Sequence, residues 1–302
     1  MYHKFRALAI KFIRYAKGMD TSQMWGKVFD LSQKQLVKFD SFSIFVMPND
    51  YIGESIIRNK SYEPHVTEII RQKLQPGDVF LDLGANLGYF TMLASTIVGE
   101  DGFVLAFEPN PQNQQLIYAS IRENQTQNIK IFPYAVSNVE DILRFTNVGS
   151  NGGVVTKHST TQNHYMLVPA VIIDHILKDC DKVDLVKIDI EAHEPQALEG
   201  MKDLIARTRP TILTEYHPWA IKHNSPVPPE NYLDQIQNLG YKISIILPNG
   251  NLKSTENNGQ ILAYYRSLNS ETAHLDLLAE PINSLDERSS KTHIPNCEIT
   301  SS

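Results

Sequence analysis

The chain is poor in cysteine and has no long apolar run. Only two of its 302 residues are cysteines, Cys180 and Cys297, and neither belongs to a C-x-x-C pair. The sequence therefore supports neither a disulfide framework nor a zinc site, and we expect a cytoplasmic protein. No stretch of about eighteen uncharged apolar residues occurs, which argues against a membrane-spanning helix.

Basic residues are also in the minority. Lys and Arg number 28 against 34 Asp and Glu, so the formal net charge is -6. Proteins that bind nucleic acids usually carry a basic excess or a basic stripe, so we expect no nucleic-acid partner and a small-molecule or carbohydrate substrate instead. The sequence does not indicate an oligomeric state.

The first forty-one residues differ from the rest in charge. Residues 4–17 contain five Lys or Arg side chains, with apolar residues at helical spacing between them. This pattern predicts a basic amphipathic helix followed by a linker. The helix is expected either to dock onto the domain or to make a weak contact with a membrane surface.

Residues 79–91, VFLDLGANLGYFT, combine a short apolar run with two glycines and a second apolar segment. This order predicts a buried strand, a tight turn and a helix, with backbone N–H groups of the turn facing a ligand above the sheet edge. Asn86 stands where the second glycine of a G-x-G-x-x-G dinucleotide turn would be, so the pyrophosphate-binding turn is not matched.

Glu108 follows the next predicted strand, residues 103–107, and lies twenty-four positions beyond Gly84. A carboxylate at this place in a strand-helix-strand unit can accept hydrogen bonds from both hydroxyls of a ribose. The alternative is that Glu108 only stabilises the start of the helix that begins near Pro109.

Further ionisable residues gather at two later strand ends. Residues 183–191 read as a buried strand, and five ionisable groups fall between Lys187 and Glu194; a second strand, residues 211–213, is followed by Glu215 and His217. Ligand chemistry in open α/β sheets collects at strand carboxyl ends, so we expect acid-base chemistry here.

The remaining segments carry weaker signals. We expect a hairpin from residues 42–47 and 51–57, and a final antiparallel strand pair from residues 241–247 and 260–265. Residues 141–170 suit either a substrate-side lid or an antiparallel insertion. Residues 266–302 are rich in Ser, Asn, Thr and Glu, which predicts a largely disordered tail with one weak helix near residues 272–278.

Over residues 42–265 the chain resembles the FkbM family of S-adenosyl-L-methionine (SAM)-dependent methyltransferases. The likeness rests on Tyr62-Glu63-Pro64, Pro76-Gly77-Asp78 before VFLDLGANLGYFT, Phe107-Glu108-Pro109, Ala135-Val136-Ser137, and Lys187-Ile188-Asp189-Ile190-Glu191 with Gly200 later. One departure is Ala192, where the family pattern has glycine, and it puts the local loop geometry in question.

The resemblance implies an α/β, Rossmann-like class I methyltransferase fold, with a seven-stranded, mostly parallel sheet, helices on both faces and an antiparallel C-terminal strand pair. It also implies O-methylation of sugar, glycan or polyketide hydroxyls. The expected domains are residues 1–41, 42–265 and 266–302. The expected SAM-binding residues are Asp82, Gly84, Ala85, Asn86, Gly88, Glu108 and Ser137, of which Ser137 equally suits a plain turn.

The candidates for the base that removes the hydroxyl proton are Asp189, His193, Glu215 and His217, and we favour Asp189 with His217. Alternatively, Asp189 caps the next helix and His217 packs in a turn. A metal site from Asp189, Glu215 and His217 is a third option without a ligand-spacing motif, so no metal is predicted. A nucleotide- or NAD-binding enzyme and a catalytically silent SAM-binding module are the competing functions.

Overall fold

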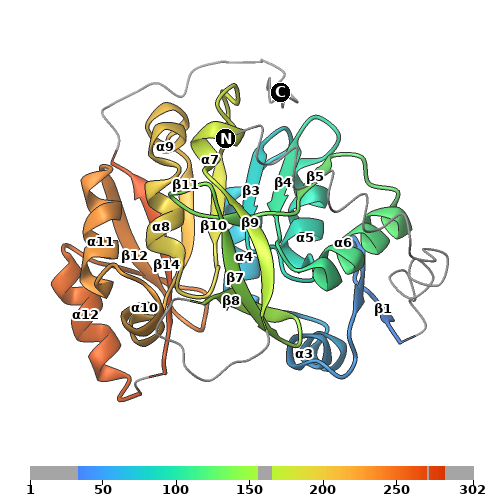
Figure 1. Ribbon diagram of the computed structural model, residues 1–302, viewed down its shortest axis with the longest axis horizontal. Helices are drawn as coiled ribbons and strands as arrows, with labels where there is room; N and C mark the ends of the chain where they lie inside the picture. Colours follow the sequence, from blue (N-terminus) through green and yellow to red (C-terminus); the bar gives the residue numbers. More distant parts are fainter. Residues whose placement is uncertain (1–32, 156–164, 271, 283–302) are drawn as a thin grey trace.

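The computed structural model describes residues 33–155, 165–270 and 272–282, and its centre is an eight-stranded mixed sheet (Figure 1). The strand order is β13-β12-β14-β11-β10-β3-β4-β5. Five strands are parallel: β3 (Val79–Leu83), β4 (Phe103–Phe107), β5 (Ile129–Phe132), β10 (Leu185–Ile188) and β11 (Thr211–Tyr216). From β3 the chain builds outward through β4 to β5, and it then returns to the other side of β3 for β10 and β11. The order therefore reverses between β3 and β10, which is where open α/β sheets bind ligands.

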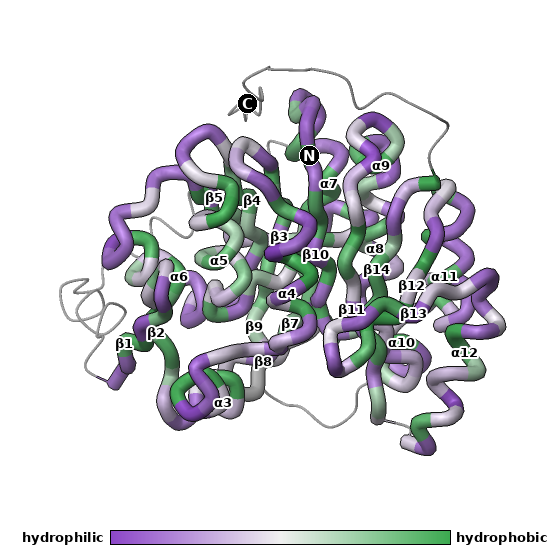
Figure 2. The backbone as a smooth tube through the Cα atoms, turned by 180° about the vertical axis from the view of Figure 1, so that it is seen from behind, coloured by the Kyte–Doolittle hydropathy of each residue, from purple (hydrophilic) through white to green (hydrophobic). Residues whose placement is uncertain are grey.

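Helices cover both faces of the sheet because its strands are apolar on both sides. In β3, Val79, Leu81 and Leu83 belong to one core cluster and Phe80 to the other. One face carries α3 (Tyr51–Asn59), α4 (Pro64–Lys73), α5 (Tyr89–Val98) and α6 (Pro111–Asn124). The other carries α7 (Ile173–Ile176), α8 (Glu194–Glu199), α9 (Lys202–Thr208), α10 (Pro218–Asn224), α11 (Pro229–Asn238) and α12 (Asn258–Ser267). Figure 2 shows the apolar colour concentrated along the central strands. The expected mostly parallel sheet with helices on both faces is confirmed.

The C-terminal strand pair exists, but one of its members was wrongly placed. β12 (Tyr241–Ile246) pairs with β14 (Leu275–Pro281), which is inserted antiparallel between β11 and β12. The helix expected near residues 272–278 is therefore wrong, and the sheet extends beyond residue 265. The strand expected at residues 260–265 is also wrong, because Ile261, Leu262 and Tyr265 contact the core as one face of α12. β13 (Leu252–Ser254) pairs with β12 and adds the eighth strand.

The N-terminal part of the described chain also differs from expectation. β2 (Ser43–Val46) pairs with β1 (Gln35–Lys38), whereas residues 51–57 lie in α3 rather than in a second strand. The helix forms because the Asp50 carboxylate accepts hydrogen bonds from the backbone N–H groups of Ile52 and Gly53 at its start. The predicted basic helix lies within residues 1–32, outside the described residues.

Residues 141–170 contribute to a small second sheet. It contains β6 (Ala135–Val136), β9 (Met166–Val171), β7 (Asp141–Val148) and β8 (Asn151–Val154), in that order. β7 pairs antiparallel with both β8 and β9, as expected for an antiparallel insertion.

Two observations bear on the cellular setting. Within the described residues, every helix is too short or too polar to span a membrane. Cys180 is buried in the core, and the other cysteine, Cys297, lies outside the described residues. The cytoplasmic location stays a prediction.

Candidate active site

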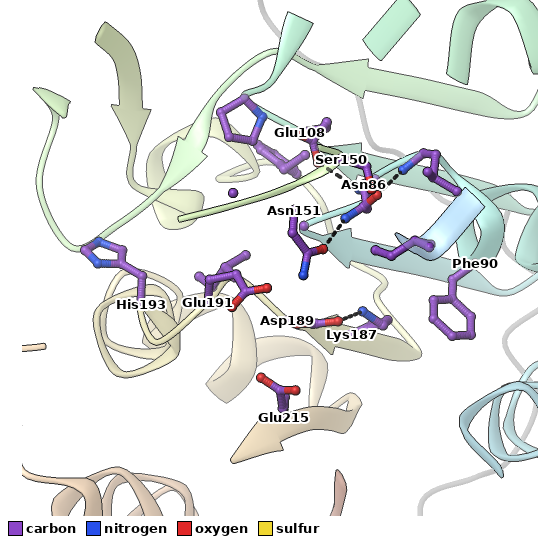
Figure 3. Close-up of a pocket in the computed structure, with 18 of the residues that line it drawn as sticks. Asn86, Phe90, Glu108, Ser150, Asn151, Lys187, Asp189, Glu191, His193 and Glu215 are labelled. Carbon is purple, nitrogen blue, oxygen red and sulfur yellow. Dashed lines mark hydrogen bonds and ion pairs between the residues drawn. The ribbon is translucent and has the colours of Figure 1, made fainter. Parts of the chain in front are cut away.

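A cavity of about 470 Å³ lies at the carboxyl ends of the parallel strands, around the point where the strand order reverses. Its walls come from the turn after β3, the ends of β4, β10 and β11, the β7–β8 turn, and the starts of α3 and α4. Figure 3 shows Asn86 and Glu108 on one side of this space and Asp189 and Glu215 on the other. The volume suits a ligand of cofactor size.

The turn after β3 lines the cavity, but its N–H groups, which were expected to face a ligand, all donate to acceptors within the chain. The N–H groups of Gly84 and Ala85 donate to the carbonyl oxygen of Phe107, over 3.0 and 3.1 Å. Gly84 has φ of +86°, and a Cβ there would lie 1.9 Å from the carbonyl oxygen of Asp189. Glycine is required because β10 passes so close. Gly84, Ala85 and Asn86 line the cavity, whereas Gly88 begins α5 behind it.

Glu108 connects the ends of β3 and β4. It is 4% exposed, and its carboxylate accepts hydrogen bonds from the backbone N–H groups of Asn86 (2.7 Å) and Asn110 (2.8 Å). Burial raises the pKa of Glu108 to about 8, although these hydrogen bonds act in the opposite direction. The side chain that caps α6 is Asn110, which accepts from the N–H of Gln112. Glu108 is therefore free of the capping role and lines the cavity.

Like Gly88, two more of the expected cofactor residues lie behind the cavity wall. Asp82 is fully buried on the α5 side of β3 and accepts a hydrogen bond from the Thr91 hydroxyl over 2.6 Å. The Ser137 hydroxyl is also buried and lies 3.0 Å from Nε2 of His193. Ser137 thus contacts a wall residue, whereas Asp82 bonds within the core, and the predicted contact of both residues with the cofactor stays a prediction.

The opposite half of the cavity is rich in carboxylates. Asp189 Oδ2 lies 2.8 Å from Nζ of Lys187, whose ammonium is 5.0 Å from the centre of the Phe90 ring. Burial lowers the pKa of Lys187, but the nearby carboxylates, above all Asp189, outweigh it and raise the pKa above its ordinary value. Lys187 is therefore a permanent cation. The pKa of Glu215 is raised well above its usual range by burial and by the charge of Asp189.

The two candidate histidines have different roles in the structure. His193 lines the cavity, and burial lowers its pKa to about 4, so the ring is neutral. His217 begins α10, and its Nδ1 accepts a hydrogen bond from the N–H of Ala220 over 3.3 Å. The ring hydrogen of neutral His217 is then on Nε2, which makes it a donor rather than a base. The turn role considered for His217 is thus observed, whereas the residue that begins α8 is His193 and not Asp189.

The metal option receives no geometric support. Across the described ranges, no group of three or more His, Cys, Asp or Glu side chains has an arrangement that could hold a metal ion.

The loop that departs from the family pattern keeps the geometry that glycine would give. Ala192 has φ of +73°, in the left-handed region, and Glu191 has φ of +55°. The buried carboxylate of Glu194 holds this loop by accepting hydrogen bonds from the N–H groups of Ile190 and Ala192, over 3.0 and 3.1 Å. Alanine at position 192 therefore does not prevent the left-handed backbone conformation that glycine would adopt there.

Several lining residues were missing from the set expected from the sequence. Tyr62 and Glu63 belong to a quoted motif, but they had no assigned role. Ser150 and Asn151, at the β7–β8 turn, line the side of the cavity that contains Asn86 and Glu108. The Asn151 side chain accepts a hydrogen bond from the Asn86 side chain over 3.1 Å. The Asp50 carboxylate anchors this turn by accepting from both the N–H and the hydroxyl of Ser150. The antiparallel insertion considered for residues 141–170 is thus observed, and it contributes to the cavity, whereas the substrate-side lid stays a prediction.

Comparison with known proteins identifies the family. The model of the methyltransferase FkbM domain matches residues 82–243, more than half of the chain. The chain belongs to the FkbM methyltransferase family. The match contains the β3 turn, Glu108, Asp189 and Glu215, so the residues that line most of the cavity are the residues of the FkbM domain.

Individual relatives of this FkbM protein are distant. Hexuronic acid methyltransferase AglP from Haloferax volcanii is 24% identical over 168 residues, which cover 53% of this chain and 65% of AglP. A probable cobalt-precorrin-6B C(15)-methyltransferase (decarboxylating) from Sulfolobus acidocaldarius is 24% identical over 51% of this chain and 84% of its own. A solved FkbM methyltransferase from Methylobacillus flagellatus aligns with 75% of this chain and 60% of its own, at 16% identity and a TM-score of 0.41.

The cavity fits SAM, the cofactor of this family. A buried carboxylate at the end of the second parallel strand suits a ribose, and Gly84, Ala85 and Asn86 of the turn after β3 line the cavity with it. Glu108, Gly84, Ala85 and Asn86 line this part of the cavity, and their contact with the cofactor stays a prediction. The protein is a SAM-dependent methyltransferase.

Proposed function

We propose that this enzyme transfers the methyl group of SAM to a hydroxyl oxygen of a sugar, a glycan or a polyketide-type small molecule. The observation that carries the proposal is one cavity with two chemically different halves, Glu108 with the β3 turn and the carboxylate-rich ends of β10 and β11. A hydroxyl is a weak acid, so a nearby proton acceptor is needed. The hexuronic acid methyltransferase among the relatives supports a carbohydrate acceptor.

Within this proposal, SAM supplies a methyl group on a positively charged sulfur. The chain holds the two reactants in line and removes the hydroxyl proton. We assign Asp189 as the group that accepts this proton, since Lys187 contacts only its Oδ2 and fixes the carboxylate in the cavity wall. His217 is assigned as a hydrogen-bond donor to an oxygen of the acceptor, because the hydrogen of its neutral ring is on Nε2.

The test uses the full chain with methyl-labelled SAM and extracts of glycans and metabolites. Mass spectrometry and NMR of the labelled product should place the methyl group on oxygen. A label on carbon or nitrogen would contradict O-methylation. Binding of SAM without turnover of any extract would instead indicate the silent module, and calorimetry with NAD tests the remaining alternative.

Replacing Glu108 with alanine is expected to weaken SAM binding about ten- to a hundredfold. The reason is the loss of the hydrogen bonds from the ribose hydroxyls, which contribute roughly 1.5 to 3 kcal/mol at a pH above 8, where the accepting carboxylate is ionised. Calorimetric titration with SAM measures the change. Glu100→Ala, in the exposed turn after α5, is the matched control. Unchanged affinity in folded Glu108→Ala protein would remove Glu108 from the site.

A further inference from the structure

Glu63 occupies the position before helix α4 in an unusual conformation. Its φ and ψ are 40° and 71°, in the left-handed region that non-glycine residues rarely adopt. Residues at this position usually have extended backbone and cap the helix with their side chain. The Glu63 side chain makes no capping hydrogen bond and instead lines the cavity. Strained backbone of this kind collects at functional sites.

The surrounding structure fixes Glu63 on the carboxylate-rich side of the cavity. Pro64 begins α4, and Nε2 of His65 lies 2.7 Å from Oδ2 of Asp276. Asp276 is on β14, directly opposite Glu215 in the strand register. At the other end of α4, Lys73 pairs with Glu280 of β14 over 2.7 Å. Two ion pairs therefore hold the helix against the strand next to β11.

The same segment is anchored through its tyrosine. The Tyr62 ring packs against those of Tyr89 and Phe90, each with ring centres 5.8 Å apart. Phe90 is also the ring beneath the Lys187 ammonium. Glu63 is thus held between a packed aromatic cluster and the end of β10.

Charged groups from several elements act on Glu63. Asp189 and Lys187 face it from β10 and Asp276 from β14, while Tyr62 and His65 belong to its own segment. Burial and the charge of Asp189 raise the pKa of Glu63 to about 7, although Lys187 lowers it. Lys187 is bonded to Asp189 over 2.8 Å, and its charge also acts on Glu63. Because like charges repel, the charge of Asp189 makes the Glu63 carboxyl easier to protonate, whereas the Lys187 ammonium acts in the opposite direction.

We propose that Glu63 and Asp189 act as a carboxylate pair that jointly holds the proton removed from the acceptor hydroxyl. This inference rests on the O-methylation proposed above. The acceptor oxygen loses its hydrogen to the pair as it bonds to the methyl carbon. The electron pair of the broken sulfur–carbon bond stays on sulfur, and the proton on the pair later passes to solvent.

The first test needs no acceptor and measures thermal unfolding of the full chain at pH 5 and pH 8. A folded-state pKa above the ordinary value means that ionised Glu63 destabilises the wild type as pH rises towards and through 7. Glu63→Gln should therefore raise Tm, relative to wild type, by about 2–4 °C more at pH 8 than at pH 5. In an Asp189→Asn background this gain should shrink, because the repulsion between the two carboxylates is gone. A gain independent of both pH and Asp189 would overturn the pair.

The second test measures kcat against pH on a neutral hexopyranoside, a hexosamine and a hexuronate, with methyl-labelled SAM. Wild-type kcat should rise as pH passes through about 7. Glu63→Gln should lower kcat at pH 8 about ten- to a hundredfold and move this rise to lower pH, with SAM affinity unchanged. Glu63→Asp should restore part of the rate. Glu68→Gln, on the exposed side of the same helix, is the control and should keep the wild-type profile.

The outcomes separate the two proposals. A wild-type profile in Glu63→Gln, with an O-methylated product, overturns the pair and leaves O-methylation standing. Absence of an O-methylated product from these probes and from the extracts counts against the proposed function, and the unfolding measurements then decide whether Glu63 and Asp189 are coupled.

Discussion

Alanine in place of Gly84 is expected to abolish SAM binding and to destabilise the fold strongly. The added Cβ would lie 1.9 Å from the carbonyl oxygen of Asp189, and the residue has φ of +86°. Relief would require the turn after β3 to move away from β10, which separates the two halves of the cavity. We expect a loss of more than about 4 kcal/mol in the free energy of unfolding, a size seen only for severe core or backbone conflicts.

The chain offers a matched control for this substitution. Gly77 has nearly the same backbone, with φ of +85°, but a Cβ there would meet no atom within 4 Å. Gly77→Ala should therefore cost only the left-handed strain of about 1–2 kcal/mol and keep SAM affinity. Thermal unfolding and calorimetry compare the two variants. Equal losses of stability in the two variants would mean that the left-handed backbone, and not the close approach to Asp189, is the reason why position 84 requires glycine.

Asn in place of Asp189 is expected to lower kcat by about a hundred- to ten-thousandfold with little change in SAM affinity. The change keeps the size of the side chain and an oxygen for Lys187, but it removes the proton acceptor, whose contribution is typically of this order. Steady-state kinetics on an identified acceptor, with calorimetry for SAM, measure both quantities. Asp179→Asn, at an exposed position, is the control.

Wild-type turnover by Asp189→Asn would place the base elsewhere. Glu215 is then the next carboxylate to change, since it lines the same half of the cavity and its pKa is also raised. Turnover that persists in EDTA would separately set aside a role for a bound metal ion.

Local patterns predicted the centre of the fold well. The run from Val79 to Leu83 and the following glycines specify a strand and a turn through short-range preferences, and β3 and α5 form there. β14 could not be found in this way, because Leu275, Leu277 and Ala279 are buried through pairing with β11 and β12. Those strands are distant in sequence, and the polar composition around β14 suggested a tail.

In the site, too, local patterns predicted some residues, whereas contacts between distant segments place the others. Glu108 and Asp189 follow strands β4 and β10, and Glu215 lies within the last two residues of β11, so the rule about strand ends placed them correctly at the cavity. Glu63 reaches it because ion pairs hold α4 on β14, and Ser150 because Asp50 anchors the β7–β8 turn. Both depend on contacts between distant segments, which spacing within a motif does not reveal.

The place of β14 in the sheet also affects how the protein acquires its structure during synthesis. The ribosome completes the five parallel strands and β12 well before Leu275–Pro281 emerges, although β14 lies between β11 and β12. Until then, the edges of β11 and β12 expose unpaired backbone groups, which can pair with other chains. The turn after β3 is therefore synthesised early, whereas the sheet stays incomplete between β11 and β12 until β14 has been synthesised.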